Sequence, residues 1–229
     1  MPRLGHGGRE GPIHGCIGDP LMEDEKRMGE IIIDRLSVGP FETNCYLLSC
    51  TGVPDRLLID PGAEAQKIWK AIGPATLRYI LITHGHGDHI AALDEIRTRT
   101  QAPVGIHRSD AWVLRRKPDI LLEDGQILNW GPISVKVIHT PGHTPGGVCF
   151  LVGRFLFSGD TIFPGGHGDT DLPGADEQMI LISIHQKIFT LPEETLIYPG
   201  HGRQTTVGRE KGSSDYPFPF SWGGRSLEP

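Results

Sequence analysis

Hydrophobic residues occur along this chain in short runs separated by glycine- and proline-rich turns, a pattern typical of many short strands. The runs at 30–38, 44–50 and 56–60 predict an antiparallel opening meander. The run at 77–82, Leu-Arg-Tyr-Ile-Leu-Ile, predicts a buried strand. Further strands are predicted at 103–106, 133–139, 147–152, 154–158 and 196–198. The two strands on either side of Gly153 are expected to pair with each other.

Three segments with helical periodicity separate these strands. Residues 63–72 and 177–189 predict helices. Residues 88–100 predict an amphipathic helix whose apolar face includes Ile90, Leu93 and Ile96. Strands and helices in this order fit two sheets flanked by helices, but order alone does not fix that arrangement.

The two ends of the chain differ from its middle. Residues 1–28 are rich in glycine, proline and charge and have no apolar period. We predict a disordered extension there, or a true start at Met28, and a single hydrolase domain over 29–229. The aromatic and proline-rich segment 216–222 is predicted to lie as a strap across the surface.

Composition narrows the classes of function. A chain of 229 residues suits one domain with a sizeable core. Its 22 Lys and Arg against 28 Asp and Glu give a net charge of −6, which disfavours nucleic-acid binding. No apolar run approaches the length of a membrane span, and the first residues lack the layout of a signal peptide. We therefore expect neither a nucleic-acid nor a membrane partner.

The cysteines indicate a reducing compartment. The chain has four scattered cysteines without a CxxC pair, namely Cys16, Cys45, Cys50 and Cys149. This pattern predicts reduced cysteines that are small core residues. A cytoplasmic location follows from this prediction. None of the four stands where we place a metal ligand.

The stretch Thr-His-Gly-His-Gly-Asp-His at 83–89 directly follows the predicted strand at 77–82. It places three imidazoles and one carboxylate within a few residues, between glycines that leave space around them. His84 and His86 point the same way if the backbone there is extended. Asp88 and His89 lie beyond the turn and face a second direction. One short segment can therefore serve two neighbouring metal ions.

Three other strand ends repeat this arrangement. His143 lies in Thr-Pro-Gly-His-Thr-Pro-Gly, Asp160 follows an apolar strand, and His201 follows Leu-Ile-Tyr-Pro-Gly. A surface loop would explain any one of these residues, but the whole set favours a metal site. The remaining histidines, at positions 6, 14, 107, 139, 167 and 185, lack this context, and only His167, in a glycine-rich loop, is kept open.

These motifs resemble those of the metallo-β-lactamase-fold hydrolases, specifically the small glyoxalase II-like branch. The resemblance covers roughly residues 29–211 and rests most specifically on the HxHxDH motif at 84–89. It also includes Val-Gly-Pro-Phe-Glu-Thr-Asn-Cys-Tyr at 38–46, Ile-Asp-Pro-Gly at 59–62 and Gly-Asp-Thr-Ile-Phe at 159–163. It implies an α/β fold built as a four-layer αββα sandwich.

The resemblance also implies two divalent metal ions. One ion takes His84, His86 and His143, the other takes Asp88, His89 and His201, and Asp160 bridges them, with Asp60 behind the ligand loop. Physical reasoning agrees, because a catalytic zinc takes three protein ligands and keeps a position open for water. A shared carboxylate brings two ions to within about 4 Å. Nitrogen and oxygen donors suit zinc, with iron or manganese as alternatives.

The implied activity is metal-assisted hydrolysis of a small thioester such as S-lactoylglutathione. Two metal ions lower the pKa of a bridging water far below its bulk value of about 15.7, and the resulting hydroxide attacks the carbonyl carbon. The thiolate leaves without a strong general acid. Asp88 would orient the hydroxide, while Asp60 and the hydroxyl of Thr83 would fix the ligand loop.

Two features of the sequence predict weak recognition of glutathione. The chain has Gly-Asp-Thr-Asp at 168–171 where the family has Gly-Arg-Thr-Asp, so Asp169 places a negative charge where an arginine is usual. Only residues 202–229 follow His201, fewer than the helical domain that contributes glutathione contacts in larger glyoxalase II enzymes. We therefore expect weak affinity for the glutathione moiety.

Three alternatives stay open. A sulfur dioxygenase of the same fold would use one iron on His84, His143 and Asp160. A lactonase or β-lactamase is the second alternative, although Asp160 stands where one lactamase subclass has a cysteine ligand. A metal-binding module without catalysis is the third, and the complete ligand set disfavours it. The native metal and the oligomeric state are not determined by the sequence.

Overall fold

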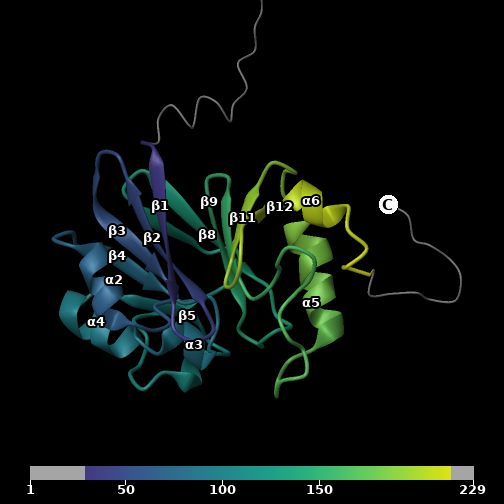
Figure 1. The fold of residues 1–229 in the computed structure, drawn as a ribbon, viewed down its shortest axis with the longest axis horizontal. Helices are drawn as coiled ribbons and strands as arrows, with labels where there is room; N and C mark the ends of the chain where they lie inside the picture. The colour runs from purple at the N-terminus through teal and green to yellow at the C-terminus, as the bar shows by residue number, and fades with distance from the viewer. Residues whose placement is uncertain (1–28, 218–229) are drawn as a thin grey trace, which may run out of the picture.

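The predicted strands assemble into two six-stranded sheets that face each other (Figure 1). The computed structural model describes residues 29–217, so the predicted extension at 1–28 and most of the predicted strap lie outside the described residues. Within that range no helix is long and apolar enough to cross a membrane.

The first sheet begins with the expected antiparallel meander. Its strands lie in sequence order, and β4, β5 and β6 add to the meander in parallel. The strands are β1 (Ile31–Val38), β2 (Thr43–Cys50), β3 (Val53–Ile59), β4 (Leu77–Leu81), β5 (Val104–His107) and β6 (Ile120–Leu122).

The second sheet has the order β12-β11-β10-β9-β8-β7. β9 and β10 pair antiparallel around Gly153 as predicted, and β11 joins β10 in parallel. The strands are β7 (Ile127–Trp130), β8 (Ile133–His139), β9 (Val148–Val152), β10 (Phe155–Gly159), β11 (Leu196–Pro199) and β12 (Thr205–Thr206).

Helices cover the outer face of each sheet, which completes the predicted αββα sandwich. Helices α2 (Ala65–Ile72) and α4 (Leu93–Thr100) lie on the first sheet, and α5 (Glu177–Ser183) lies on the second (Figure 1). The 3₁₀ turn η1 (Ala111–Val113) and the helix α6 (Val207–Lys211) are shorter additions.

Two predicted helices differ from the observed ones. The single helix expected at 88–100 is split into α3 (Gly87–Ile90) and α4, because the amide of Ala92 donates to the carbonyl of Pro61 (3.0 Å) and not within a continuous helix. The helix expected at 177–189 is α-helical only over α5, and a π-helical turn, η2 (Ile184–Ile188), follows it directly. The strands β6, β7 and β12 were not predicted.

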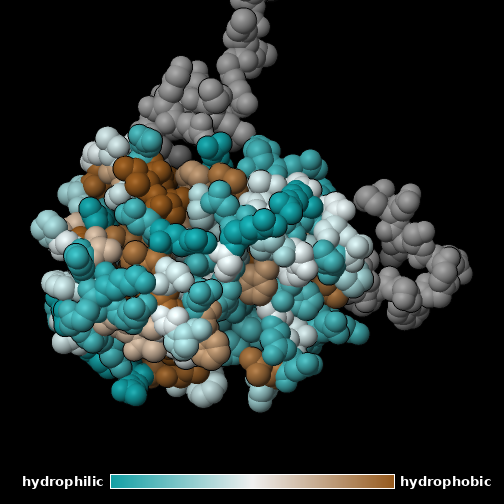
Figure 2. Space-filling view, in the orientation of Figure 1, coloured by the Kyte–Doolittle hydropathy of each residue, from teal (hydrophilic) through white to brown (hydrophobic). Residues whose placement is uncertain are grey.

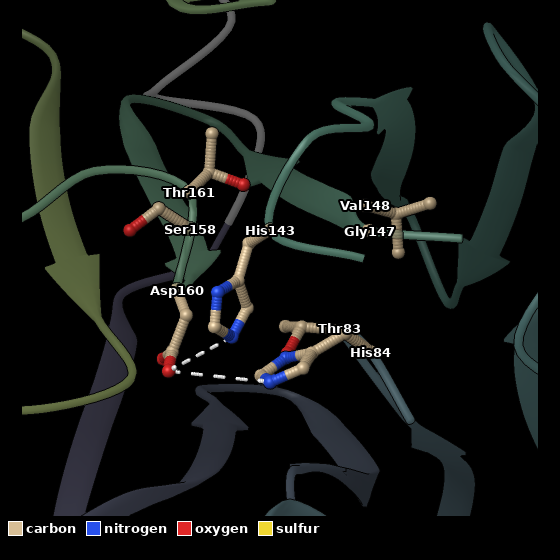
Figure 3. Close-up of a pocket in the computed structure, with 8 residues that line it drawn as sticks. All are labelled: Thr83, His84, His143, Gly147, Val148, Ser158, Asp160 and Thr161. Carbon is tan, nitrogen blue, oxygen red and sulfur yellow. Dashed lines mark hydrogen bonds and ion pairs between the residues drawn. The ribbon is translucent and has the colours of Figure 1, made fainter. Parts of the chain in front are cut away.

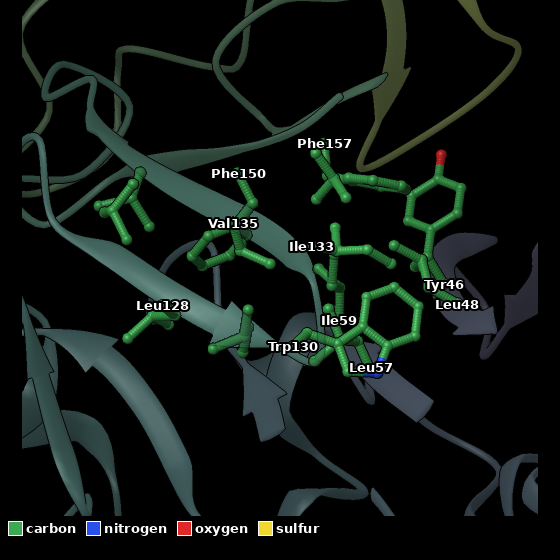
Figure 4. Close-up of a cluster of buried hydrophobic side chains, with 14 of the residues drawn as sticks. Tyr46, Leu48, Leu57, Ile59, Leu128, Trp130, Ile133, Val135, Phe150 and Phe157 are labelled. Atoms are coloured by element: carbon green, nitrogen blue, oxygen red, sulfur yellow. The ribbon is translucent and has the colours of Figure 1, made fainter. Parts of the chain in front are cut away.

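A hydrophobic core fills the space between the sheets (Figure 4). Its largest fully buried side chains include Trp130, Phe150 and Phe157. The indole Nε1 of Trp130 donates to the carbonyl of Asp55 (2.9 Å), so its one polar atom is satisfied. Hydrophilic residues cover most of the face seen in Figure 2, and its largest brown patch lies near the outer ends of β1 and β3.

The two sheets are joined by hydrogen bonds at one edge. The backbone amide of Asn44 donates to Gly200 (2.7 Å), and its side-chain amide donates to Pro199 (2.9 Å). The amide of Val148 donates to the carbonyl of Thr83 (2.8 Å). The end of β11 therefore meets β2, and the end of β4 meets β9, next to the predicted ligand residues.

Candidate metal centre

All seven predicted ligand residues converge at the edge where the sheets are joined. The structure brings their donor atoms into three groups, with the atoms of each group within 4.8 Å of one another. The groups are His84, His86 and His143; His84, His89 and Asp160; and Asp88, His89 and His201. The first and third groups are the two ligand sets expected from the sequence.

Asp160 lies between these two sets. Its Oδ2 is 3.5 Å from Nε2 of His143 and 3.6 Å from Nε2 of His201. Its Oδ1 is 3.4 Å from Nε2 of His89. Figure 3 shows the imidazoles of His84 and His143 directed at this carboxylate from neighbouring elements. A carboxylate placed in this way can bridge two ions.

Hydrogen bonds to the outer ring nitrogens orient three of the histidines. Nδ1 of His89 lies 2.9 Å from Oδ2 of Asp60, Nδ1 of His143 lies 2.7 Å from the carbonyl of Asp169, and Nδ1 of His201 lies 2.9 Å from the carbonyl of Phe41. Carbonyl and carboxylate oxygens only accept, so each Nδ1 donates. In the neutral ring Nε2 then carries a lone pair directed at the centre, as metal-ligating histidines require.

Asp60 also orients His84 through Thr83. The hydroxyl of Thr83 donates to Oδ2 of Asp60 (2.6 Å), so it can accept from Nδ1 of His84, 3.0 Å away. The amide of Thr83 donates to the other oxygen of Asp60 (2.8 Å). Asp60 has a φ of 51°, an uncommon left-handed conformation at the end of β3. The structure thus places Asp60 behind the ligand loop, in contact with it.

Three buried polar atoms of the centre have no hydrogen-bond partner among residues 29–217. They are Nε2 of His84, Nε2 of His89 and Oδ1 of Asp160. Buried polar atoms in folded proteins nearly always have a partner, so such a cluster requires an explanation. All three are nitrogen or oxygen donors facing the same space, and a divalent metal ion would satisfy them.

The carboxylates of the centre are held ionised. Burial opposes ionisation of Asp160, but the close contact with His89 and the charge of His89 outweigh it and lower the pKa of Asp160. Burial likewise opposes ionisation of Asp88, and the contacts with His201 and His89 lower its pKa well below the usual range. Two anionic carboxylates supply the negative charge that a pair of cations needs.

The surroundings of the histidines shift their pKa values in different directions. Burial lowers the pKa of His84, and the neighbouring imidazoles lower it further. Burial acts in the same direction on His89, but the carboxylates of Asp60 and Asp160 outweigh it and raise the pKa of His89 to about 10. His89 therefore gives up a proton when its Nε2 becomes a ligand, so metal binding there is coupled to proton release.

Two glycines are required by close approaches at the centre. Gly159 has a φ of 49°, and a Cβ at this position would overlap the hydroxyl of Thr83. A Cβ at Gly200 would overlap Oδ1 of Asp160. Larger side chains at these positions would push Thr83 or the bridging carboxylate out of place.

Sequence reasoning missed two aspartate contacts. Asp110, after β5, is buried and accepts from the amide of Gly85 in the ligand loop (2.9 Å). Thr43 donates to Oδ2 of Asp88 (2.9 Å). Asp110 follows an apolar strand, the same signal that marks Asp160. His167, kept open from the sequence, contacts the carbonyl of Gly168 through Nδ1 and belongs to none of the three groups.

The sequence profile of the Metallo-beta-lactamase superfamily matches residues 38–201. The chain is 38% identical over 208 residues to "Probable metallo-hydrolase YqgX" of Bacillus subtilis (strain 168), covering 82% of this chain and 98% of the relative. It is 31% identical over 206 residues to hydroxyacylglutathione hydrolase GloC of Haemophilus influenzae, covering 80% and 97%.

Solved structures share the fold. The BLEG-1 B3 metallo-beta-lactamase matches with a TM-score of 0.76 at 34% identity, covering 82% of this chain and 99% of the other. ETHE1 from Myxococcus xanthus matches with a TM-score of 0.72 at 30% identity, covering 79% and 82%. TTHA1623 in a di-iron-bound form matches with a TM-score of 0.66 at 34% identity, covering 78% and 97%.

Proposed function

The chain belongs to the metallo-β-lactamase superfamily and is a metallo-hydrolase, and we propose that it hydrolyses a small thioester such as S-lactoylglutathione at a dinuclear centre. The observation that carries this proposal is the position of Asp160 between two complete ligand sets. The identity with GloC, whose name specifies a hydroxyacylglutathione hydrolase, supports the thioester class.

Each residue of the centre has its own role in the proposed reaction. His84, His86 and His143 would hold one ion, Asp88, His89 and His201 the other, and Asp160 both. When bound, such ions lower the pKa of a coordinated water and polarise a substrate carbonyl. Asp88 is partly exposed and, with one oxygen bonded to Thr43, keeps its carboxylate in a fixed position to accept a hydrogen bond from the attacking water. Zinc is the favoured metal, with iron or manganese as alternatives.

An apolar cavity beside Asp88 fits the acyl part of a small substrate. The cavity has a volume of about 350 Å³ and is lined by Val38, Phe41, Ala63, Ala91 and Asp88, among others. Phe41 is 70% exposed and forms part of its rim. Apolar walls with a few polar groups, here Thr43 and Asp88, are the usual composition of a small-ligand pocket.

The test couples metal analysis to an assay of several substrates. Purified protein is expected to contain close to two transition-metal ions per chain and to release thiol from S-lactoylglutathione or a related small thioester. Protein with two bound ions that turns over no thioester would contradict the substrate class. A reproducible single ion, with His89 and His201 dispensable for activity, would contradict the dinuclear centre.

A second candidate is a sulfur dioxygenase with one iron. It needs only His84, His143 and Asp160. The Nε2 atoms of His84 and His143 lie 4.0 and 3.5 Å from Oδ2 of Asp160. The identity with ETHE1 is compatible with this candidate. Iron content together with oxygen consumption on a glutathione persulfide separates it from hydrolysis.

The likeness to BLEG-1 keeps a β-lactamase or lactonase as a further candidate. Turnover of nitrocefin or of a panel of lactones, faster than turnover of any thioester, would favour it over the proposed function.

A further inference from the structure

Asp110 connects the two loops that carry the three-histidine group. It lies after β5 and is 3% exposed. Its Oδ2 accepts from the amide of Gly85 (2.9 Å) and from the hydroxyl of Thr144 (2.7 Å), and its Oδ1 accepts from the amide of Gly146 (2.7 Å). Gly85 stands between His84 and His86, and Thr144 follows His143.

We propose that Asp110 is a positioning residue that holds His84, His86 and His143 in place for one metal ion. This inference rests on the proposed dinuclear centre. Asp110 acts on the two ligand loops through the backbone amides of Gly85 and Gly146 and the hydroxyl of Thr144.

These two loops come from different sheets, so no single strand fixes their relative position. His84 and His86 follow β4 of the first sheet, whereas His143 follows β8 of the second. Three donors bind one ion well only when they are held together before the ion arrives. A buried carboxylate with two donors from one loop and one from the other supplies that constraint.

The packing around the carboxylate agrees with this role. A Cβ at Gly146 would overlap the Asp110 side chain, and a Cβ at Gly85 would press on Asp110 and Val113. Glycine at both positions lets the loop backbones approach close enough to donate to one carboxylate. Asp60 performs the equivalent task for Thr83 and His89 on the other side of the loop.

The informative variant is Asp110→Asn, which keeps the size of the side chain. An amide has only one acceptor oxygen. If that oxygen faces Gly85 and Thr144, the NH₂ group faces the N–H of Gly146, and if it faces Gly146, the NH₂ group faces the N–H of Gly85, so a backbone bond to one ligand loop is lost in either orientation. Co²⁺ titration followed by visible absorption measures the affinity of each metal equivalent. We expect the affinity of one equivalent to fall roughly 10- to 100-fold, the usual effect of losing a group that orients metal ligands, and the other to change less.

Asp119→Asn is the matched control. Asp119 also accepts from a backbone amide, that of Val104 (2.8 Å), and pairs with Arg97 (2.8 Å), but it contacts neither ligand loop. We expect wild-type Co²⁺ affinity from this variant. Thr144→Val removes one of the three bonds and is expected to lower the affinity less than Asp110→Asn, which keeps the proposal testable if Asp110→Asn does not fold.

The outcomes separate positioning from general stability. A purely structural role would lower the melting temperature of the metal-free protein and leave Co²⁺ affinity unchanged well below that temperature. Unchanged affinity in folded Asp110→Asn, or in Thr144→Val, would overturn the inference while the proposed function stands. Wild-type protein that binds no pair of Co²⁺ ions would overturn the proposed function, and the inference with it.

Discussion

The outer nitrogen of each inward-facing histidine is as informative as the nitrogen that faces the centre. Nδ1 of His89, His143 and His201 each bonds to an oxygen that can only accept, which selects the tautomer that presents Nε2 inward. Two of these oxygens are backbone carbonyls, those of Phe41 and Asp169. The side chains at these two positions can therefore change without removing the bond.

Replacing Asp160 tests the bridge. Asp160→Ala is expected to abolish turnover and to reduce metal content at both sites, because this carboxylate contacts donors of both ligand sets. Asp88→Ala is expected mainly to empty the site that includes His201. Metal content by mass spectrometry and the turnover number measure both effects, with the exposed residue Glu194→Ala as control. Full metal loading and measurable hydrolysis in Asp160→Ala would disprove the bridging role.

Reversing the charge at Asp169 tests recognition of an anionic substrate. The side chain of Asp169 is exposed and accepts from the amide of Asp171 (2.8 Å), while its carbonyl holds His143. Asp169→Arg is expected to lower the KM for S-lactoylglutathione a few-fold at low salt, since exposed charge contacts contribute about 0.2–1 kcal/mol. kcat should change little. A KM that does not respond at low salt would place Asp169 away from the bound substrate.

At the scale of elements, the bounds of the short helices near the centre depend on tertiary hydrogen bonds as well as on local helix propensity. Helix α3 is a single turn that carries Asp88 and His89, and it ends where the amide of Ala92 bonds to Pro61. The longer α5 is a more autonomous helix, with Asp176 as its N-cap. The amide of Asp176 also donates to the carbonyl of Gly142 (2.7 Å), which links this helix start to the loop of His143.

The cap of α5 can be tested apart from the centre. Oδ1 of Asp176 accepts from the amide of Met179 (2.9 Å), so Asp176→Ala is expected to lower the free energy of unfolding by about 1 kcal/mol. Urea denaturation measures the change. Asp176→Asn retains a capping oxygen and should stay close to the wild type. Equal losses in both variants would show that the charge and not the cap stabilises the helix.

At the scale of the whole molecule, one core between two sheets supports the site. The sheets also exchange hydrogen bonds at the site edge, through Asn44 and Val148. The three described cysteines, Cys45, Cys50 and Cys149, are buried and free, as expected for small core residues. The cytoplasmic location inferred from the cysteines stays a prediction.

Two tryptophans allow the core to be tested with a matched pair. Trp130 is fully buried between the sheets and Trp112 is 82% exposed. Trp130→Ala is expected to lower the free energy of unfolding by about 3–5 kcal/mol, because it leaves a cavity and also removes the bond to Asp55. Trp112→Ala should change it by at most about 0.5 kcal/mol. Thermal or urea unfolding compares them, and similar effects in the two would contradict the assigned core.

The sequence by itself determined which residues are candidate ligands and at which strand ends they lie. Strand ends are visible in local apolar periodicity, and an HxHxDH motif next to such an end places four donors within one short segment. His143, Asp160 and His201 carried the same local signal, and the structure brings all of them together. The sandwich itself followed from the family resemblance, not from the order of elements.

Tertiary structure decided what orients these residues. The partners of the outer nitrogens are the carbonyls of Phe41 and Asp169 and the side chain of Asp60, all distant in sequence from the histidines they hold. The split of the helix at 88–100 likewise depends on a bond to Pro61. The role of Asp110 appears only when loops from two sheets meet at one carboxylate. Local pattern cannot encode such contacts, because each forms only after distant segments have packed.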